Sequence, residues 1–198
     1  MARSRAHDFE AKRRAILHSA AAVFAEAGMD RASMSRIAER ADVSKALLYH
    51  YYASRDALIF DILRTNLSEL EAAILAADLP DAPPRDRLRA LVHAVLEKYR
   101  DADDYHTVQL NGTKALPESQ RVEIITIERR ILRRFASVLR DIHPGIEAER
   151  PLLMPVTMSL FGMMNWMYMW FRDGGPVSRA DYADLATDLM LGGIETLR

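Results

Sequence analysis

The sequence contains no cysteine, which excludes disulfide bonds and metal sites built on thiolates. It also contains no internal repeat and no low-complexity tract. With 49% apolar and 28% charged residues, the composition is that of an ordinary soluble protein. A chain of 198 residues is long enough to bury a sizeable core, as one domain or as two small ones.

No apolar run reaches the roughly 18 uninterrupted residues that a membrane span requires. The longest candidate, residues 154–171, is interrupted by small, polar or helix-breaking residues: Pro155, Thr157, Ser159, Gly162 and Asn165. The N-terminal stretch MARSRAHDFEAKRR is charged and lacks the apolar core of a signal peptide. We therefore expect a cytoplasmic protein with no membrane partner.

The net charge of −1 is unevenly distributed along the chain. Residues 1–60 carry ten Lys and Arg against seven Asp and Glu, whereas residues 61–198 carry seventeen against twenty-one. A basic first part indicates an anionic partner for that part, such as nucleic acid. A difference of this size also occurs on ordinary solvated surfaces, so it needs independent support.

No alternating pattern of the strand type is present, and apolar residues recur with the period of an amphipathic helix. The sequence therefore predicts an all-α fold with about nine helices. Gly28 is placed to end the first helix, and three prolines make residues 78–85 the main break. The buried face of the first helix is expected to carry Phe9, Ile16, Leu17, Ala20, Ala21 and Phe24. The expected helices are residues 8–27, 33–41, 44–52, 55–70, 86–100, 105–110, 118–142, 151–172 and 178–197.

Two of these helices are short and follow each other closely. Ser33 and Ser44 are suited to cap them, and the last helix has Ser178 and Asp181 for the same purpose. The spacing of the apolar residues Ile37, Ala38, Ala41, Val43 and Leu48 is typical of a helix-turn-helix motif, in which two short helices pack across a tight turn. Such motifs present the first turn of the second helix to base edges in the major groove of DNA. Lys45, Ala46 and Leu47 occupy that turn.

The second short helix ends in an unusual aromatic cluster, YHYY, at residues 49–52. Tyr52 falls one helical turn after Leu48 and is expected in the core. Tyr49 and Tyr51 are expected to point outward, where a phenolic hydroxyl can donate to a phosphate oxygen. His50 is compatible with either position. An aromatic cluster in a helical protein is also commonly core, so spacing alone leaves DNA binding open.

The stretch from Arg14 to Leu58 resembles the N-terminal signature of the tetracycline-repressor (TetR) family of transcriptional regulators. The matching residues are Ile16-Leu17, Ala20-Ala21, Phe24, Gly28, Ser33-Met34, Ile37-Ala38, Ala41, Val43-Ser44, Leu48-Tyr49, Tyr52, Arg55-Asp56 and Leu58. The resemblance implies a helix-turn-helix DNA-binding domain at residues 8–56, with its motif at about 33–52. It also implies a helical ligand-binding and dimerisation domain at residues 57–198.

Three positions depart from the pattern that the family commonly shows. Asp42 and Ala46 stand where glycine is common, and Arg55 stands where lysine is common. Asp tolerates a positive φ better than most residues, so the turn is expected to survive. Arg55 keeps a positive charge for phosphate. The DNA-binding residues expected from motif and resemblance are Ser33, Arg36, Ser44, Lys45, Ala46, Leu47, Tyr49, His50, Tyr51 and Arg55.

The segment from residue 151 to 171 is rich in methionine and aromatic residues and is apolar nearly all round. Such a helix must be buried on more than one side, for example against a ligand pocket and a partner subunit. The simpler alternative is that its methionines fill a core. Small residues at 159, 162, 192 and 193 permit close helix approach, and with the family resemblance they place the last two helices in a homodimer interface.

A second, shorter resemblance links MNWMYMWFRDGGPVS and Leu191–Ile194 to TetR-type regulators of fatty-acid, steroid or aromatic-acid breakdown, several of which respond to acyl-CoA thioesters. It implies a largely apolar inducer, such as an acyl-CoA. Arginines 129, 130, 133 and 134 are compatible with binding CoA phosphates or with an ordinary solvated face. The expected ligand-binding residues are Tyr99, Phe135, Met158, Phe161, Asn165 and Met169.

No arrangement of catalytic residues is evident. The sequence has no cysteine nucleophile, no nucleophile-elbow serine and no glycine-rich phosphate loop. His93 and Glu97 lie one helical turn apart, but no third metal ligand is expected nearby, so an ordinary surface pair is favoured. No enzyme activity and no cofactor are therefore expected. The family resemblance implies a ligand-responsive repressor that binds a palindromic DNA operator as a homodimer and is released by a small, largely apolar ligand. The alternative is a helical small-molecule carrier or enzyme that does not bind DNA.

Overall fold

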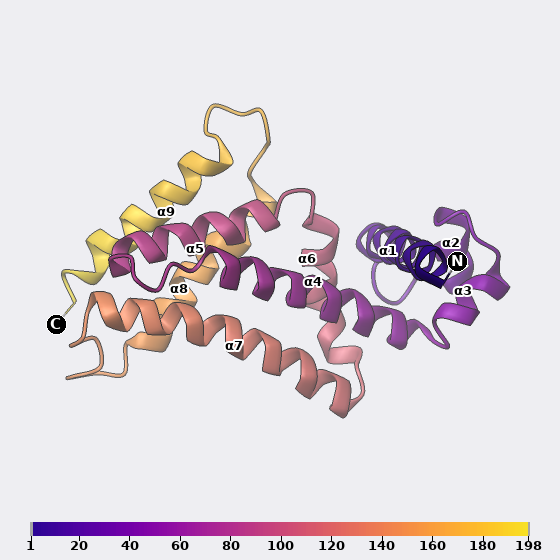
Figure 1. Ribbon diagram of the computed structural model, residues 1–198, viewed down its shortest axis with the longest axis horizontal. Coiled ribbons are helices and arrows are strands. Elements are labelled where there is room, and N and C mark those ends of the chain that lie inside the picture. The colour runs from indigo at the N-terminus through magenta and orange to yellow at the C-terminus, as the bar shows by residue number, and fades with distance from the viewer. Residues whose placement is uncertain (1, 198) are drawn as a thin grey trace. The chain divides into compact units, whose positions relative to one another are not determined.

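The protein is built almost entirely from helices (Figure 1). The structure, a computed structural model, describes residues 2–197, with side chains from residue 7 onward. This part of the chain contains nine α-helices, two short 3-10 helices and no strand, which confirms the predicted fold class. The elements are α1 (Ala2–Ala27), α2 (Met34–Arg40), α3 (Lys45–Tyr51), α4 (Arg55–Ala77), α5 (Pro84–Lys98), α6 (Asp103–Gly112), η1 (Thr113–Ala115), α7 (Glu118–Ile142), α8 (Leu153–Asn165), η2 (Trp166–Met169) and α9 (Arg179–Ile194).

The chain packs into two compact units. Unit 1 comprises Met1–Leu67 and Ala102–Ile125, and unit 2 comprises Ser68–Asp101 and Thr126–Arg198. Helices α4 and α7 therefore each contribute residues to both units. These units are defined by packing and not by function. The predicted boundary after residue 56, between a DNA-binding and a ligand-binding domain, therefore stays a prediction. None of the helices in residues 2–197 has the length and hydropathy needed to cross a membrane.

In unit 1, α1 packs against α2 and α6, and α2 packs against α3 (Figure 1). The apolar face of α1 is buried as predicted, apart from Phe9, which is 46% exposed. The Phe9 ring stacks on Tyr51 of α3, with 4.7 Å between ring centroids and 17° between planes, and so does not enter the core. The prediction that α1 begins at residue 8 was also wrong, because the helix extends back to Ala2.

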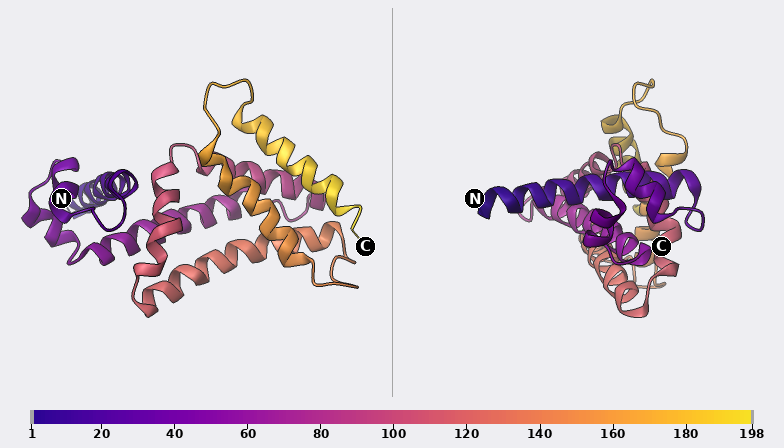
Figure 2. Two further views of the ribbon diagram at one scale, coloured as in Figure 1. Left: turned by 180° about the vertical axis from the view of Figure 1, so that it is seen from behind. Right: turned by 90° about the vertical axis from the view of Figure 1, so that its right-hand side faces the viewer.

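In unit 2, α5 lies along α9, and α8 contacts both (Figures 1 and 2). Helix α7 meets α8 through an edge-to-face pair of Phe135 and Phe161, whose ring centroids are 4.9 Å apart. Both rings are buried, and such pairs contribute roughly 0.5–1.5 kcal/mol beyond their area burial. The connection between η2 and α9 extends away from the helices it joins (Figure 2).

The single helix predicted over residues 151–172 is in fact two elements, α8 and η2. Pro155 lies in the first turn of α8, where its missing N–H would have no partner within the helix. The chain tightens into the 3-10 helix η2 after Asn165, as is common at helix ends. The predicted cap of the last helix is confirmed, because Ser178 and Asp181 form a capping box at the start of α9.

A buried carboxylate, Asp61 of α4, joins three elements of unit 1. Its two oxygens accept hydrogen bonds from Nε and Nη2 of Arg13 in α1, at 2.9 and 2.6 Å. The hydroxyl of Tyr52, the residue that caps the C-terminus of α3, donates to Asp61 at 2.7 Å, and Arg64 donates at 2.9 Å. Asp61 therefore fixes the end of α3 to both α1 and α4. We call these four residues the Asp61 network.

The charge state of Asp61 follows from its surroundings. Burial tends to raise the pKa of Asp61, but the hydrogen bonds from Arg13, Tyr52 and Arg64 together outweigh it and lower the pKa below the ordinary value of 3.8. The Tyr52 phenol responds in the opposite direction: burial first, and then its hydrogen bond to Asp61, raise its pKa. At neutral pH the network thus consists of a carboxylate, two guanidinium groups and a neutral phenol.

Replacing Asp61 with Asn is expected to lower the free energy of unfolding by about 3 kcal/mol at pH 7, because it leaves Arg13 without its buried charge partner. Since folding lowers the pKa of Asp61, its contribution is complete above the unfolded value of 3.8 and is lost as the pH falls through the lower folded value. The difference between Asp61→Asn and the parent should therefore shrink toward pH 3 in urea titrations followed by circular dichroism.

The control is Glu10→Gln, which also removes an ion pair of Arg13 but at an exposed position. It should cost less than about 1 kcal/mol. An equal loss of unfolding free energy in the two variants would show that Asp61 stabilises unit 1 no more than an exposed ion pair does.

Candidate functional site

Helices α2 and α3 form the predicted helix-turn-helix. Ile37, Ala38 and Leu48 are buried, as the spacing predicted, whereas Val43, which was expected in the same small core, is only half-buried. Val43 N–H donates to the Ala38 carbonyl at 3.0 Å, which closes the turn. Asp42 adopts φ 50°, so this Asp takes the left-handed conformation that glycine commonly supplies, as expected.

The first turn of α3 faces solvent and is held by its cap. Ser44 Oγ accepts a hydrogen bond from Leu47 N–H at 3.1 Å, which satisfies one of the free amides at the helix start. Lys45 and Ala46 are exposed, and Leu47 is half-buried. The turn is therefore a capped, solvent-facing helix end, and an α-helix is of the size that enters a major groove. Contact of these residues with bases stays a prediction.

The aromatic cluster that ends α3 is divided between core and surface. Tyr52 is buried, as predicted, while Tyr49 is 52% exposed and His50 is also exposed. Tyr51, also expected to point outward, is half-buried, and its ring stacks on Phe9. No local pattern predicts this stack, because Phe9 and Tyr51 lie on helices that are far apart in the chain. Contact of Tyr51 with DNA stays a prediction.

The other residues expected at DNA already make contacts within unit 1. Ser33 Oγ accepts from Arg36 N–H at 3.2 Å, and Arg36 is paired with Glu26 at 3.5 Å. Arg55 donates from Nη1 to the Met29 carbonyl at 2.8 Å, so one arm of its guanidinium is engaged inside the unit. A serine hydroxyl that accepts a capping bond can still donate to a phosphate. The role of all three residues at DNA stays a prediction.

Four of the six residues expected to line a ligand pocket form interacting pairs in unit 2. Tyr99 donates from its hydroxyl to Asn165 Oδ1 at 2.8 Å, and Phe135 and Phe161 form the edge-to-face pair. Burial, followed by the charge of Glu128, raises the pKa of Tyr99, so the phenol stays neutral. The remaining two, Met158 and Met169, are each 51% exposed and lie on the surface of α8 and η2. The lining of an inducer pocket by these six residues stays a prediction.

Two cavities of unit 2 lie elsewhere, and neither is lined by any of those six residues. One, of about 450 Å³, lies between α4 and α7 and carries Arg130, Arg133 and Arg134. Two of these arginines are paired: Arg130 donates to both oxygens of Glu71 at 2.6 and 2.7 Å, and Arg134 donates to Asp78 at 3.0 Å.

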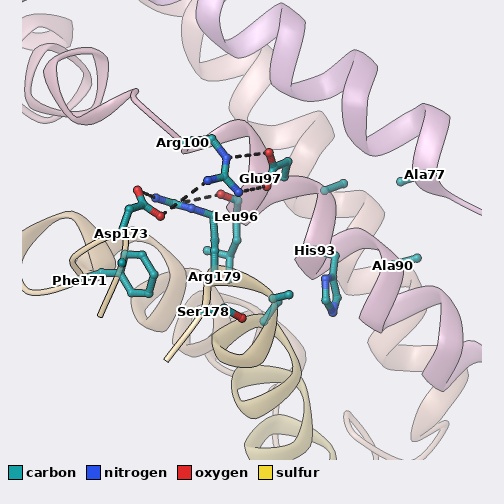
Figure 3. A pocket seen from close by; sticks show the side chains of 14 residues that line it. Ala77, Ala90, His93, Leu96, Glu97, Arg100, Phe171, Asp173, Ser178 and Arg179 are labelled. Atoms are coloured by element: carbon teal, nitrogen blue, oxygen red, sulfur yellow. Dashed lines mark hydrogen bonds and ion pairs between the residues drawn. The ribbon is translucent and has the colours of Figure 1, made fainter. Parts of the chain in front are cut away.

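The other cavity, of about 710 Å³, lies between α5 and α9, and we call it the α5–α9 cavity (Figure 3). Its lining combines alanines, a phenylalanine and several ion pairs. It is lined by Ala77, Ala90, His93, Ala94, Leu96, Glu97, Arg100, Phe171, Asp173, Gly174, Ser178, Arg179, Ala180 and Ala183. His93 pairs with Asp184 at 2.8 Å and Glu97 with Arg100 at 2.7 Å, and no cluster suited to a metal ion occurs among the described residues.

An all-helical chain whose capped α3 presents a solvent-facing first turn defines a protein of the helix-turn-helix DNA-binding class. The family model described as "Bacterial regulatory proteins, tetR family" matches residues 16–62. A second, "Tetracyclin repressor-like, C-terminal domain", matches residues 81–194. The chain therefore belongs to the TetR family of transcriptional regulators, as the sequence resemblance predicted.

Individual relatives match over most of their length. The crystal structure of a TetR-family transcriptional regulator from Bordetella parapertussis 12822 is 34% identical, with a TM-score of 0.82 over 94% of this chain and 97% of that one. The transcriptional activator FasR of Mycolicibacterium smegmatis is 26% identical over 92% of this chain and 83% of its own. The transcriptional repressor KstR2 of Mycobacterium tuberculosis is 27% identical over 92% of both chains.

Substitutions in α3 should separate affinity from sequence preference. Tyr49→Phe removes an exposed hydroxyl and should weaken binding about fivefold to tenfold for every DNA sequence, because a phosphate contact is independent of sequence. Lys45→Ala should instead change which operator is preferred, because a side chain in the first turn meets base edges. Selection from a random DNA library, followed by fluorescence anisotropy, measures both effects.

Lys114→Ala is the matched control, since Lys114 is an exposed lysine of η1 outside the helix-turn-helix. It should leave the selected sequence unchanged. If Lys45→Ala selected the same sequences as the parent, Lys45 would have no role in base contact.

Proposed function

We propose that this TetR-family protein is a repressor that binds a palindromic operator as a homodimer and leaves it when a largely apolar ligand, such as an acyl-CoA, binds. The observation that carries the DNA-binding part is the capped, solvent-facing first turn of α3. Lys45 in that turn and Tyr49 one turn further supply a cation and a hydroxyl donor on one exposed face. Binding through phosphates releases counterions, so affinity should fall steeply with salt. A protein without salt-dependent binding to any DNA would instead be a helical carrier or enzyme.

The homodimer is supported by an apolar surface that this chain leaves uncovered. Large apolar side chains gather on α8, η2, α9 and the segments beside them: Met154, Met158, Trp166, Met169, Trp170, Val177, Leu185 and Leu189 are all exposed. Large apolar side chains exposed together on neighbouring elements are typical of interaction surfaces in soluble proteins. A second copy of the same surface, related by a twofold axis, would cover it and present two α3 helices to a palindromic site.

Three glycines add to this argument. A side chain added at Gly162, Gly192 or Gly193 would meet nothing within 4 Å in this chain, so packing inside the chain does not require glycine there. Close approach of another helix would require it, because only small residues let two helix backbones come near each other. In the proposed dimer these positions lie where α8 and α9 meet their counterparts.

Replacing Leu189, which is 59% exposed on α9, with Asp should produce a monomer with little operator affinity. The carboxylate would have to lose its water on assembly, and burying an unpaired charge is strongly unfavourable. The loss should be at least a hundredfold at micromolar protein, because one half-site supplies only half of the contacts. Sedimentation and anisotropy measure the two properties.

The control is Leu110→Asp, a substitution at a similarly exposed leucine of α6. It should leave both the sedimentation and the operator affinity unchanged. Tight operator binding by a monomeric Leu189→Asp protein would overturn the dimer.

The ligand part of the proposal is supported by the apolar and aromatic side chains that α5, α7 and α8 contribute to unit 2. Phe135 and Phe161 are buried side by side, and the Tyr99–Asn165 hydrogen bond sets a polar pair among apolar neighbours. Ligand sites commonly combine an apolar lining with a few polar groups of this kind. The ligand must bind the DNA-free arrangement better, and by reciprocity the operator must weaken the ligand. A hundredfold loss of operator affinity needs a coupling of only about 2.7 kcal/mol.

A panel of acyl-CoAs of increasing chain length should therefore weaken operator binding in anisotropy titrations, at least tenfold for the best of them.

Tyr99→Phe removes the hydroxyl that donates to Asn165. It should shift the concentration of inducer required about threefold to tenfold, without changing operator affinity in the absence of ligand. Tyr182→Phe is the control, since this tyrosine also donates a hydrogen bond in unit 2, to the Met163 carbonyl. If no acyl-CoA changed operator affinity, the proposed ligand class would be wrong. The proposed role as a DNA-binding regulator would be unaffected by that result.

A further inference from the structure

The α5–α9 cavity contains an arginine that is almost completely buried. The side chain of Arg179, the first residue of α9, is 9% exposed. Its Nη1 donates to the Leu96 carbonyl at 3.2 Å, and the ring of Phe171 lies 4.9 Å from its guanidinium carbon. Figure 3 shows this side chain between α5 and the segment that precedes α9. Burying a cation is costly, so its hydrogen bonds should be complete.

The hydrogen bonds of Arg179 are not complete. Its Nη2 donates to Asp173 Oδ2 at 2.8 Å, but its Nε is buried and has no partner among the described residues. Nε and Nη2 lie on one edge of the planar guanidinium, and this edge is suited to bind both oxygens of a carboxylate or phosphate. Asp173 accepts a hydrogen bond from only one of these two nitrogens, Nη2. An oxyanion with two oxygens in the plane of the guanidinium would accept from both Nη2 and Nε.

Few contacts hold the carboxylate of Asp173 in place beside Arg179. It is an exposed residue in the connection between η2 and α9, in which residues 172–178 are all exposed and Gly174 has φ +83°. Its second cation, Arg100, is 3.7 Å away and is bound more closely by Glu97, at 2.7 Å. The ion pair between Arg100 and Asp173 is exposed on both sides and contributes little. The carboxylate of Asp173 is itself 50% exposed, so an incoming anion can reach the position that it occupies beside Arg179.

The remainder of the cavity is suited to an apolar body. Five alanines line it, from the end of α4, from α5 and from the start of α9, and Leu96 lies beside the charged end. Small side chains on facing helices leave room, and about 710 Å³ is within the range of ligand sites. His93 also lines it, with its Nε2 paired to Asp184, which Arg89 also contacts at 2.7 Å.

We propose that the α5–α9 cavity binds an amphipathic organic anion, whose oxyanion headgroup displaces Asp173 from Arg179 and Arg100 and whose apolar body lies along the alanines. This site shares no residue with the six expected to hold an inducer, and it does not depend on DNA binding. Asp173 occupies the headgroup position when the site is empty. The headgroup chemistry fits a carboxylate or a phosphate ester equally.

Calorimetric titration of the full chain with octanoate, octyl phosphate and the neutral 1-octanol tests the proposal. Both anions should bind, and 1-octanol should bind at least tenfold more weakly than the better one. Asp173→Asn should tighten anion binding about fivefold, because it removes the competing charge. Arg100→Gln should weaken it about fivefold. Tighter binding of octyl phosphate than of octanoate assigns a phosphate headgroup, and the reverse assigns a carboxylate.

The matched control is Asp141→Asn, which removes an exposed, arginine-paired carboxylate outside the cavity and should leave anion binding unchanged. Arg100 is exposed, and Asp173→Asn keeps an amide oxygen that can still accept from Arg179 Nη2, so both variants should fold. Circular dichroism of each variant checks this. Equal binding of 1-octanol, an unchanged anion affinity in Asp173→Asn, or no anion binding in either protein would each overturn the proposal. Operator affinity is measured on the same preparations. It tests the proposed regulator function independently of whether the α5–α9 cavity binds an anion.

Discussion

The position of α3, the second helix of the helix-turn-helix, depends on the buried carboxylate of Asp61. A buried charge is tolerated only where several donors replace its water, and here Arg13, Tyr52 and Arg64 supply them. Tyr52 follows α3 directly, so the carboxylate fixes the C-terminal end of that helix, while Ser44 caps its N-terminal end. With both ends held, the exposed first turn of α3 has one orientation within unit 1, which is what specific recognition of a groove requires.

A second buried carboxylate occupies the other end of α4. Asp78, whose side chain is almost completely buried, accepts hydrogen bonds from Arg87 at 2.9 Å and Arg134 at 3.0 Å, which join the end of α4 to α5 and α7 in unit 2. The bond from Arg87 outweighs burial and lowers the pKa of Asp78. Helix α4 thus carries one ion-pair cluster in each unit. A ligand that moved the Asp78 cluster would act on the same helix that carries Asp61, which gives the proposed coupling a continuous physical element.

Unit 2 contains two different kinds of surface that its own packing does not complete. The apolar side chains of α8, η2 and α9 lack a cover, and a second copy of the chain is the occupant we propose. In the α5–α9 cavity one buried donor, Arg179 Nε, lacks a hydrogen-bond partner among the described residues, and an amphipathic organic anion is the occupant we propose. The two sites call for different partners. The apolar surface is stabilised by a partner that removes a wide apolar area from water, whereas Arg179 is stabilised by two oxygens in the plane of its guanidinium.

Local sequence signals determined the helices, their caps and the placement of the helix-turn-helix, because helix period and capping depend on residues within a few positions of one another. They also identified Tyr52 as core and Tyr49 as exposed. Contacts between distant helices were beyond those signals. The stack of Phe9 on Tyr51, the convergence of Arg13 and Tyr52 on Asp61, and the incomplete hydrogen bonding of Arg179 arise only when separate helices pack together. Periodicity gives the face of a helix that is buried, but tertiary packing alone decides what that face meets.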